Sequence, residues 1–309
     1  MEICGYPLWV VGLVCVGVFC ASFMDAIGGG GGIISLPSYL LAGVPMHFAL
    51  GTNKLSSCIG TVASTARFIK NGCVDWVLGI PSIGLALYGA HLGTSLQLML
   101  DEKYLKFLLL LVLPVIALIL FKKKELPEKR EAMNEWKRRG IVWGFSLVVG
   151  AYDGFYGPGT GTFLLLAFCY LAKIDVRTAS GNVKLVNLSS NIGALATSLA
   201  AGKVLVPIGL MAAVFSAAGQ YLGAGLALKN GSKIVRPVIL VVLTLLTVKV
   251  VVRFQPNFSW HNFTNSREDT GSLSHIIRQK RYSPSGIFGI LIGFPPLSTI
   301  VVCIYSLQQ

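Results

Sequence analysis

Long uninterrupted apolar runs are the feature that most limits how this chain can fold. Residues 105–121 read LKFLLLLVLPVIALILF and residues 238–252 read VILVVLTLLTVKVVV, which is close to the roughly 20 residues that cross a hydrocarbon core. The mean hydropathy is +0.70 and only 13% of the residues are charged, against about 25% in soluble domains. The runs lack the alternation of membrane β-strands. The sequence therefore predicts an all-α, multi-pass membrane protein, because a helix satisfies its own backbone groups in lipid.

The chain contains an internal repeat. Lys54 is matched by Lys184 at an offset of 130 residues, and Asp25 is matched by Asp153 at an offset of 128. Chance agreement of small residues is common in membrane proteins, but a single register and a repeated lysine favour duplication. Further pairs at the offset of 130 are Gly51 and Gly181, Leu55 and Leu185, Gly79 and Gly209, Gly89 and Gly219, and Gly93 and Gly223.

Each repeat is predicted to hold about four to five helical segments, of which the second is too short to span a membrane. The predicted organisation is a first transmembrane repeat (1–121), a basic loop (122–139), a second transmembrane repeat (140–253) and an atypical tail (254–309) with a further apolar stretch. The segments expected are 8–26, 31–43, 48–69, 76–99 and 104–121 in the first repeat, and 140–152, 160–172, 181–201, 204–228 and 237–252 in the second.

Basic residues gather between two apolar blocks. Residues 122–139 hold eight Lys or Arg and four Glu, the pattern of a cytoplasmic loop under the positive-inside rule. With this loop inside, the other basic positions favour two repeats of inverted topology and an N-terminus outside. The first apolar segment is expected to be a membrane helix and not a cleaved signal peptide. The net charge of +13 thus indicates topology in the cytoplasmic membrane, with the lipid bilayer and no nucleic acid as partner.

Glycines interrupt an apolar segment directly after each aspartate. Asp25 is followed by five glycines at 28–32, and Asp153 is followed by GPGTG at 157–161. Glycine and proline make helix continuation costly, so we expect broken or re-entrant half-helices at both places. The peptide N–H groups at the start of a half-helix favour anions. The glycines predicted to contact a substrate are Gly29, Gly30, Gly31, Gly157 and Gly159.

A lysine lies near the start of the long segment that follows each glycine turn. A charge at mid-membrane costs roughly 2.5 to 3.5 kcal/mol, so both lysines and both aspartates must face the interior, a wet cavity or one another. Asp25 and Asp153 are candidates for coupling to a proton or a cation. Two readings stay open for the polar groups, a site for a small anion or ion-pair and amide contacts that only hold helices together. The remaining candidate substrate contacts are Thr52, Asn53, Lys54, Asn182, Lys184, Asn187 and Asn191.

Signals for other chemistry are weak. The seven cysteines form no CxxC pair, and the four histidines lack metal-ligand spacing. The glycine run is not followed by G-K-[ST], and there is no nucleophile elbow or pair of catalytic carboxylates. We therefore predict no catalytic residue, no metal, no cofactor and no enzymatic activity.

The motifs together resemble the sulfite exporter (TauE/SafE) family of membrane permeases. The resemblance rests on DAIGGGGGIISLPSYLLAGVPMHFALGTNKL near the start and on YDGFYGPGTGTFLLLAF, KLVNLSSNIGALATSLAAGKV and GQYLGAGLALKNGSKIVRP further on, and it covers about residues 8–252. It implies a secondary transporter of a small anion, often a sulfur-containing one such as sulfite or a sulfonate. Residues 254–309 depart from the family pattern.

Two other functions compete with the transporter. A passive anion channel could use the same glycine-lined constriction, and a membrane-bound enzyme is a third and weaker hypothesis. The transported anion, the direction of transport, the coupling ion and the oligomeric state stay open, and a homo-oligomer is compatible with the sequence.

Overall fold

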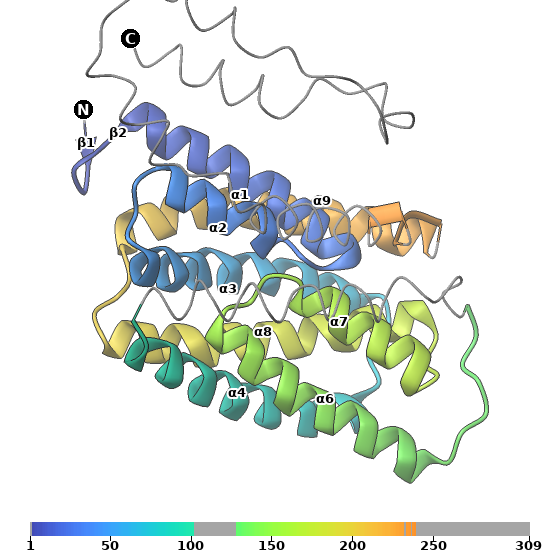
Figure 1. Ribbon diagram of the computed structural model, residues 1–309. Helices are drawn as coiled ribbons and strands as arrows, with labels where there is room; N and C mark the ends of the chain where they lie inside the picture. The colour runs from blue at the N-terminus through green and yellow to red at the C-terminus, as the bar shows by residue number, and fades with distance from the viewer. Residues whose placement is uncertain (1, 102–127, 232, 236, 239–309) are drawn as a thin grey trace, which may run out of the picture. The chain divides into compact units, whose positions relative to one another are not determined.

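The computed structural model describes residues 2–101, 128–231, 233–235 and 237–238 (Figure 1). The expected segment 104–121, nearly all of 237–252 and the tail 254–309 lie outside these described residues. Within them the protein is helical apart from one short hairpin, which confirms the predicted all-α class. The helices of the first part are α1 (Leu8–Gly28), α2 (Gly32–Leu41), α3 (Met46–Lys70) and α4 (Trp76–Met99), and those of the second are α6 (Glu135–Phe155), α7 (Thr160–Leu166), the π-helical turn η1 (Ala167–Leu171), α8 (Val176–Ala200) and α9 (Val206–Asn230).

The hairpin at the N-terminus is an element that the apolar pattern does not predict. Strand β1 (Glu2–Ile3) pairs antiparallel with β2 (Tyr6–Pro7). The two residues between the strands, Cys4 and Gly5, have φ angles of 54° and 80°. Positive φ angles at both central residues are those of a type I′ turn, one of the two common connections of two-residue hairpins.

The helix breaks predicted after Asp25 and Asp153 are confirmed. Helix α1 ends at Gly28, and Gly29 and Gly30 then take φ angles of 79° and 86° before α2 begins. Helix α6 ends at Phe155, and Gly157 and Gly159 have φ angles of 94° and 86° before α7 begins. These angles favour glycine because a Cβ atom strains the left-handed region. Both short helices that follow, of 10 and 7 residues, are half-helices.

Two helices begin earlier than their apolar segments. Helix α6 starts at Glu135 and α8 at Val176, whereas the sequence predicts segments from 140 and 181. The reason is polar N-capping: the side chain of Asn134 accepts a hydrogen bond from the Trp136 N–H, and that of Asp175 accepts one from the Thr178 N–H. Such caps satisfy helix N–H groups that have no intrahelical partner.

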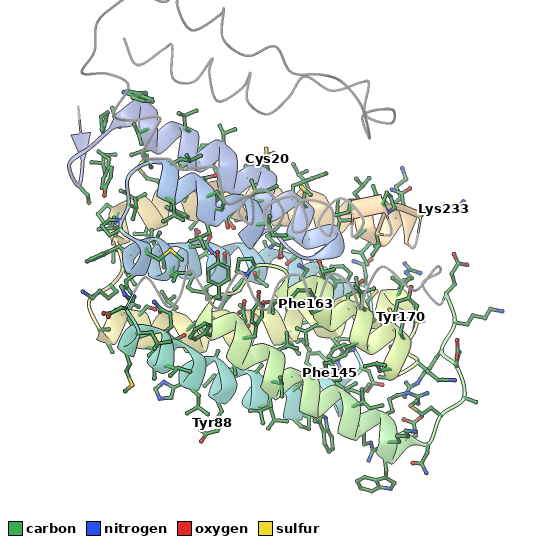
Figure 2. The ribbon with its side chains drawn as sticks, in the orientation of Figure 1. Cys20, Tyr88, Phe145, Phe163, Tyr170 and Lys233 are labelled. Atoms are coloured by element: carbon green, nitrogen blue, oxygen red, sulfur yellow. The ribbon has the colours of Figure 1, made fainter. Side chains whose placement is uncertain are left out.

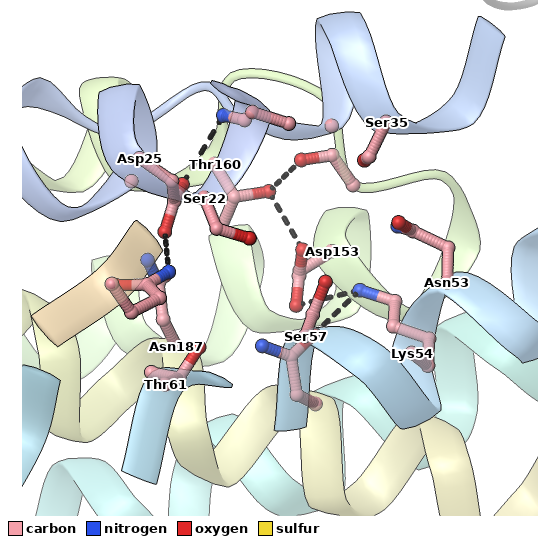
Figure 3. Close-up of a pocket in the computed structure, with 17 residues that line it drawn as sticks. Ser22, Asp25, Ser35, Asn53, Lys54, Ser57, Thr61, Asp153, Thr160 and Asn187 are labelled. Atoms are coloured by element: carbon pink, nitrogen blue, oxygen red, sulfur yellow. Dashed lines mark hydrogen bonds and ion pairs between the residues drawn. The ribbon is translucent and has the colours of Figure 1, made fainter. Parts of the chain in front are cut away.

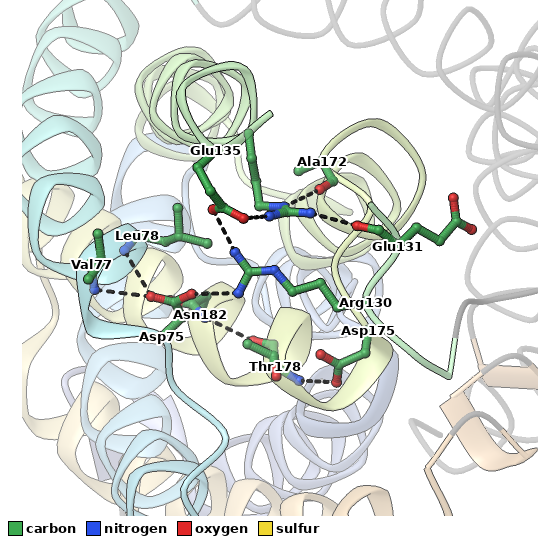
Figure 4. A network of polar contacts seen from close by, with 11 residues as sticks. Asp75, Val77, Leu78, Arg130, Glu131, Glu135, Ala172, Asp175, Thr178 and Asn182 are labelled. Carbon is green, nitrogen blue, oxygen red and sulfur yellow. Dashed lines mark hydrogen bonds and ion pairs between the residues drawn. The ribbon is translucent and has the colours of Figure 1, made fainter. Parts of the chain in front are cut away.

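The end of the predicted basic loop is therefore structured (Figure 4). Arg130 pairs with Asp75, the N-cap of α4, at 3.1 Å and with Glu135 in the first turn of α6 at 2.8 Å. Arg138 is 1% exposed and donates to the carbonyl oxygens of Ala172 and Glu131. These bonds tie residues 130–138 to the ends of α4 and η1.

Helices α3 and α8 lie in the middle of the arrangement, between the α1–α9 pair and the α4–α6 pair (Figure 1). The order of packed neighbours is α1, α9, α3, α8, α4, α6. Exchanging each helix with its counterpart in the other predicted repeat gives the same order read from the opposite end. Helices α3 and α8 are antiparallel, because Gly181 near the start of α8 packs on the Cys73 carbonyl beyond the end of α3, and Gly51 packs on the Lys203 carbonyl beyond the end of α8.

Three of the described helices are long and apolar enough to cross a membrane: α1, α4 and α9. Their outward faces carry large exposed apolar side chains, such as Tyr88 on α4, which is 58% exposed (Figure 2). Helices α3 and α8 have 25 residues each, about 37 Å at 1.5 Å per residue. Unlike the first three, each of them buries a lysine side chain, Lys54 on α3 and Lys184 on α8.

Candidate functional site

The two glycine turns touch each other inside the protein. The hydroxyl of Thr162 in α7 donates to the carbonyl oxygen of Gly28 at 2.8 Å. A methyl group on Gly29 would overlap the backbone of Gly161 and Thr162. Glycine is required here because the backbones of two elements approach closely. The two breaks in the helices, one from each repeat, therefore form one structural unit.

Two ion pairs cross between the predicted repeats beside these turns, and Figure 3 shows the first of them, between Lys54 and Asp153. Lys54 Nζ of α3 lies 2.9 Å from Asp153 Oδ2 of α6, and Lys184 Nζ of α8 lies 2.9 Å from Asp25 Oδ2 of α1. The side chains of Lys54, Asp153 and Lys184 are 3 to 8% exposed, and that of Asp25 is 19% exposed. Each lysine thus pairs with a carboxylate of the other predicted repeat, and the four charges sum to zero.

Neutral hydrogen-bonding groups complete the surroundings of each carboxylate. Asp153 receives a hydrogen bond from the Ser190 hydroxyl at 2.6 Å on Oδ2, and the Thr160 hydroxyl lies 3.0 Å from its Oδ1. Asp25 receives bonds from the Gln220 amide at 2.8 Å and from the Gly31 N–H at 3.2 Å. Buried charges are tolerated when they are paired and hydrogen-bonded in this way.

A polar cavity of about 50 Å³ lies between the two glycine turns and the lysines (Figure 3). This volume has room for a few water molecules or one small ion. Among the residues that the structure describes, three amide oxygens close to the cavity are buried without a hydrogen-bond partner, those of Asn53, Asn187 and Gln220. They leave acceptors free for whatever fills the cavity. The predicted residues that line it are Asp25, Gly31, Asn53, Lys54, Asp153, Gly157, Asn187 and Asn191.

The other predicted residues do not line the cavity. Thr52 accepts a hydrogen bond from the Leu205 N–H, and Asn182 donates to the Thr178 carbonyl at the far end of α8. Both make contacts between or within helices, and their role as substrate contacts stays a prediction. Gly29, Gly30 and Gly159 shape the turns through their left-handed φ angles. Lys184 does not line the cavity itself, but its ammonium group is hydrogen-bonded to the Asp25 carboxylate, which does.

Several lining residues carry signals too weak to select from the sequence. Ser22 precedes Asp25 by three residues and so shares its helix face. Thr160 stands within the GPGTG motif, and Gln220 is the polar residue among the glycines of α9. Ser35 and Thr61 also line the cavity. Within the part of the chain that the structure describes, no group of three or more His, Cys, Asp or Glu side chains could hold a metal ion.

Fold and site together define a helical, multi-pass membrane protein with buried, paired charges around an internal cavity, which is the class of membrane transporters. Comparison with known proteins gives the family. The family described as "Sulfite exporter TauE/SafE" matches residues 13–250. The chain belongs to this family.

Relatives carry consistent descriptions. A Sinorhizobium protein described as "Probable membrane transporter protein ORF9" is 34% identical over 76% of this chain and 90% of its own length. A Haemophilus influenzae "Probable membrane transporter protein" is 34% identical over 77% of this chain and 93% of its own length. "Probable membrane transporter protein YfcA" of Escherichia coli K12 is 32% identical over 75% and 86%. No solved structure is significantly similar to the chain.

Proposed function

We propose that this protein is a secondary active transporter of a small anion in the cytoplasmic membrane, with sulfur oxyanions such as sulfite or a sulfonate as the first candidates. The observation that carries the proposal is the pair of ion pairs that cross between the repeats at one polar cavity. The sulfur-containing class is suggested by the family description. Transport by alternating access is proposed because the packing order reads the same from either repeat, as in transporters built from inverted repeats.

Carboxylate groups already occupy places that suit an anion. One Asp25 oxygen accepts a hydrogen bond from the Gly31 N–H at the start of α2 and the other contacts the Lys184 ammonium. A half-helix N-terminus and a lysine are the groups that would bind a substrate anion. Lys54 is occupied in the same way as Lys184, because its ammonium group contacts the Asp153 carboxylate and donates to the Asn191 amide oxygen. A substrate anion would therefore compete with an aspartate for each lysine.

This competition suggests how transport is coupled. Protonation of an aspartate would remove its negative charge and leave the paired lysine free to hold the substrate anion. The positive and negative charges of the site would then balance with the substrate anion bound, just as they balance in the structure without an anion. A buried charge without a partner is costly, so the anion and the proton would bind together.

Reconstituted transport tests the proposal. Proteoliposomes containing the full chain should take up sulfite in a saturable manner that a proton gradient stimulates. We expect Lys54→Met and Lys184→Met to reduce this uptake at least tenfold, and Lys229→Met, at an exposed position on α9, to leave it unchanged. Thiosulfate, sulfonates and small carboxylates complete the panel of substrates.

Two results would contradict the transporter. Uptake of every anion that is unchanged in both lysine variants would remove the crossed ion pairs from the mechanism. Flux that neither saturates nor depends on a proton gradient would instead indicate a passive channel.

A further inference from the structure

The two aspartates occupy equivalent positions but face different chemistry. Within the described residues, each group bonded to the Asp25 carboxylate is a donor: the Lys184 ammonium, the Gln220 amide nitrogen and the Gly31 N–H. Donors stabilise an ionised carboxylate and offer no acceptor for a carboxylic proton. The groups around Asp25 therefore stabilise the ionised form of its carboxylate.

Asp153 has a different partner at its Oδ1 atom. The Thr160 hydroxyl lies 3.0 Å from Asp153 Oδ1 and 2.6 Å from the carbonyl oxygen of Gly157. A hydroxyl group carries one proton and two acceptor lone pairs. Because a carbonyl oxygen can only accept, the shorter contact takes the threonine proton. The contact between Thr160 Oγ1 and Asp153 Oδ1 is then a hydrogen bond when the Asp153 carboxyl group supplies the proton.

We propose that Asp153, and not Asp25, is the coupling carboxyl group, protonated at Oδ1, with Thr160 as the positioning residue that accepts this proton in a hydrogen bond. This inference rests on the proposed transport function. The chain of bonds runs from Asp153 Oδ1–H to Thr160 Oγ1, and from Thr160 Oγ1–H to the Gly157 carbonyl. The proton comes from water and returns to water on the other side, so only O–H bonds are made and broken.

The other oxygen of Asp153 supports this assignment. Oδ2 contacts both the Lys54 ammonium and the Ser190 hydroxyl, which are donors and which remain in place when Oδ1 is protonated. A neutral Asp153 no longer offsets the charge of Lys54, which keeps its hydrogen bonds to Asp153 Oδ2 and to Asn191 Oδ1 at 3.2 Å. The ammonium charge is then available on the wall of the cavity.

The charged and titratable groups around Asp153 come from several elements. Lys54 of α3 contacts it directly. The Asp25–Lys184 pair joins α1 and α8 in the same site and is neutral as a unit. On the helix of Asp153 itself, the Tyr152 hydroxyl donates to the Pro158 carbonyl, and Tyr156 follows one turn later. α7 contributes the neutral Thr160, and α8 contributes the neutral Ser190 and Asn187.

Infrared difference spectroscopy across a pH series tests the assignment without any transported anion. Full-length protein in liposomes should show the carbonyl band of one protonated carboxylic acid on acidification. The band should be lost in Asp153→Asn and kept in Asp25→Asn. In Thr160→Val the band should shift to the frequency of a free acid and form only at lower pH, because the protonated state loses its acceptor. Thr160→Ser should restore the original band.

Thr162→Val is the matched control, since Thr162 of α7 also donates to a carbonyl oxygen, that of Gly28, but is hydrogen-bonded to no carboxylate within the described residues. We expect it to leave the band unchanged. Thermal unfolding of each variant checks that it folds. If Asp153→Asn does not fold, the bands of Thr160→Val and Thr160→Ser decide whether Asp153 is the protonated group. A band lost in Asp25→Asn, a band insensitive to Thr160→Val, or no pH-dependent band in the unchanged protein would each overturn the inference. Sulfite uptake by the unchanged protein would still stand in those cases, so the transport proposal is judged separately.

Discussion

Four buried charges set the energetics at the scale of single residues. Lys54 and Asp153 form one crossed pair, and Lys184 and Asp25 form the other. Desolvation of two charges is expensive, so such a pair adds little net stability. Removal of one partner is different, because it leaves a buried charge uncompensated, at a cost of about 3 to 5 kcal/mol.

This asymmetry gives a first prediction. Lys54→Met should lower the stability of the folded protein by about 3 to 5 kcal/mol, whereas Lys54→Met combined with Asp153→Asn should recover most of the loss. The double variant should still be unable to transport sulfite, because it lacks the cationic group. Thermal unfolding in detergent and uptake in proteoliposomes measure the two effects. A double variant as unstable as Lys54→Met alone would show that the pair is not the source of the effect.

The site could be predicted from the sequence in part, and the reasons lie in particular residues. Lys54 and Asp153 stand out because an ionised group in an apolar segment must find a partner or water. Gln220 does not stand out, because its partner Asp25 lies 195 residues away and a glutamine in a membrane helix is commonly a packing contact. That the lysines would be held by aspartates of the opposite repeat follows only from the three-dimensional arrangement.

At the scale of elements, glycines set how closely the helices pack. Helices α4 and α6 meet where Gly93 faces the backbone of Ala151 and Gly89 faces that of Leu147. On α9, Gly219 and Gly223 face the backbone of α1 in the same way. Small residues allow close backbone contact between membrane helices, where van der Waals packing drives association.

A second prediction follows for this contact. Gly93→Ala should destabilise the protein by about 1 to 3 kcal/mol, because the added methyl group would overlap the Ala151 carbonyl. Gly84→Ala on the same helix, where nothing lies within 4 Å of the added group, should be neutral or slightly stabilising. The two variants are compared by thermal unfolding. Equal effects would mean that helix propensity, and not packing, determines the result.

The length of an apolar segment predicts that it is a helix, but it does not predict the residue at which the helix begins. The breaks after Asp25 and Asp153 were predictable because glycine and proline oppose helix continuation. The starts at Glu135 and Val176 were missed because polar caps and charged first turns extend these helices beyond their apolar segments. The hairpin before α1 was also missed, since two-residue strands are too short to show alternation.

At the scale of the whole molecule, inverted topology makes a prediction for two matched positions. Asn71 follows α3 and Ala201 follows α8 at the repeat offset of 130, and both are exposed. We expect Ala201→Cys to react with an impermeant maleimide in intact cells, and Asn71→Cys to react only after permeabilisation. Each is introduced into a variant without native cysteines. Labelling of both from the same side would contradict the inverted repeats.

The crossed ion pairs also make the order of synthesis matter. The ribosome completes α1 to α4 first, and these carry Asp25 and Lys54 toward the bilayer long before Asp153 and Lys184 exist as counter-charges. A product that stops after α4 would hold Asp25 and Lys54 without Lys184 and Asp153, the groups that bind them in the full chain. We therefore expect neither crossed ion pair to form until both halves of the chain have been made, so that each half depends on the other for the partners of its buried charges.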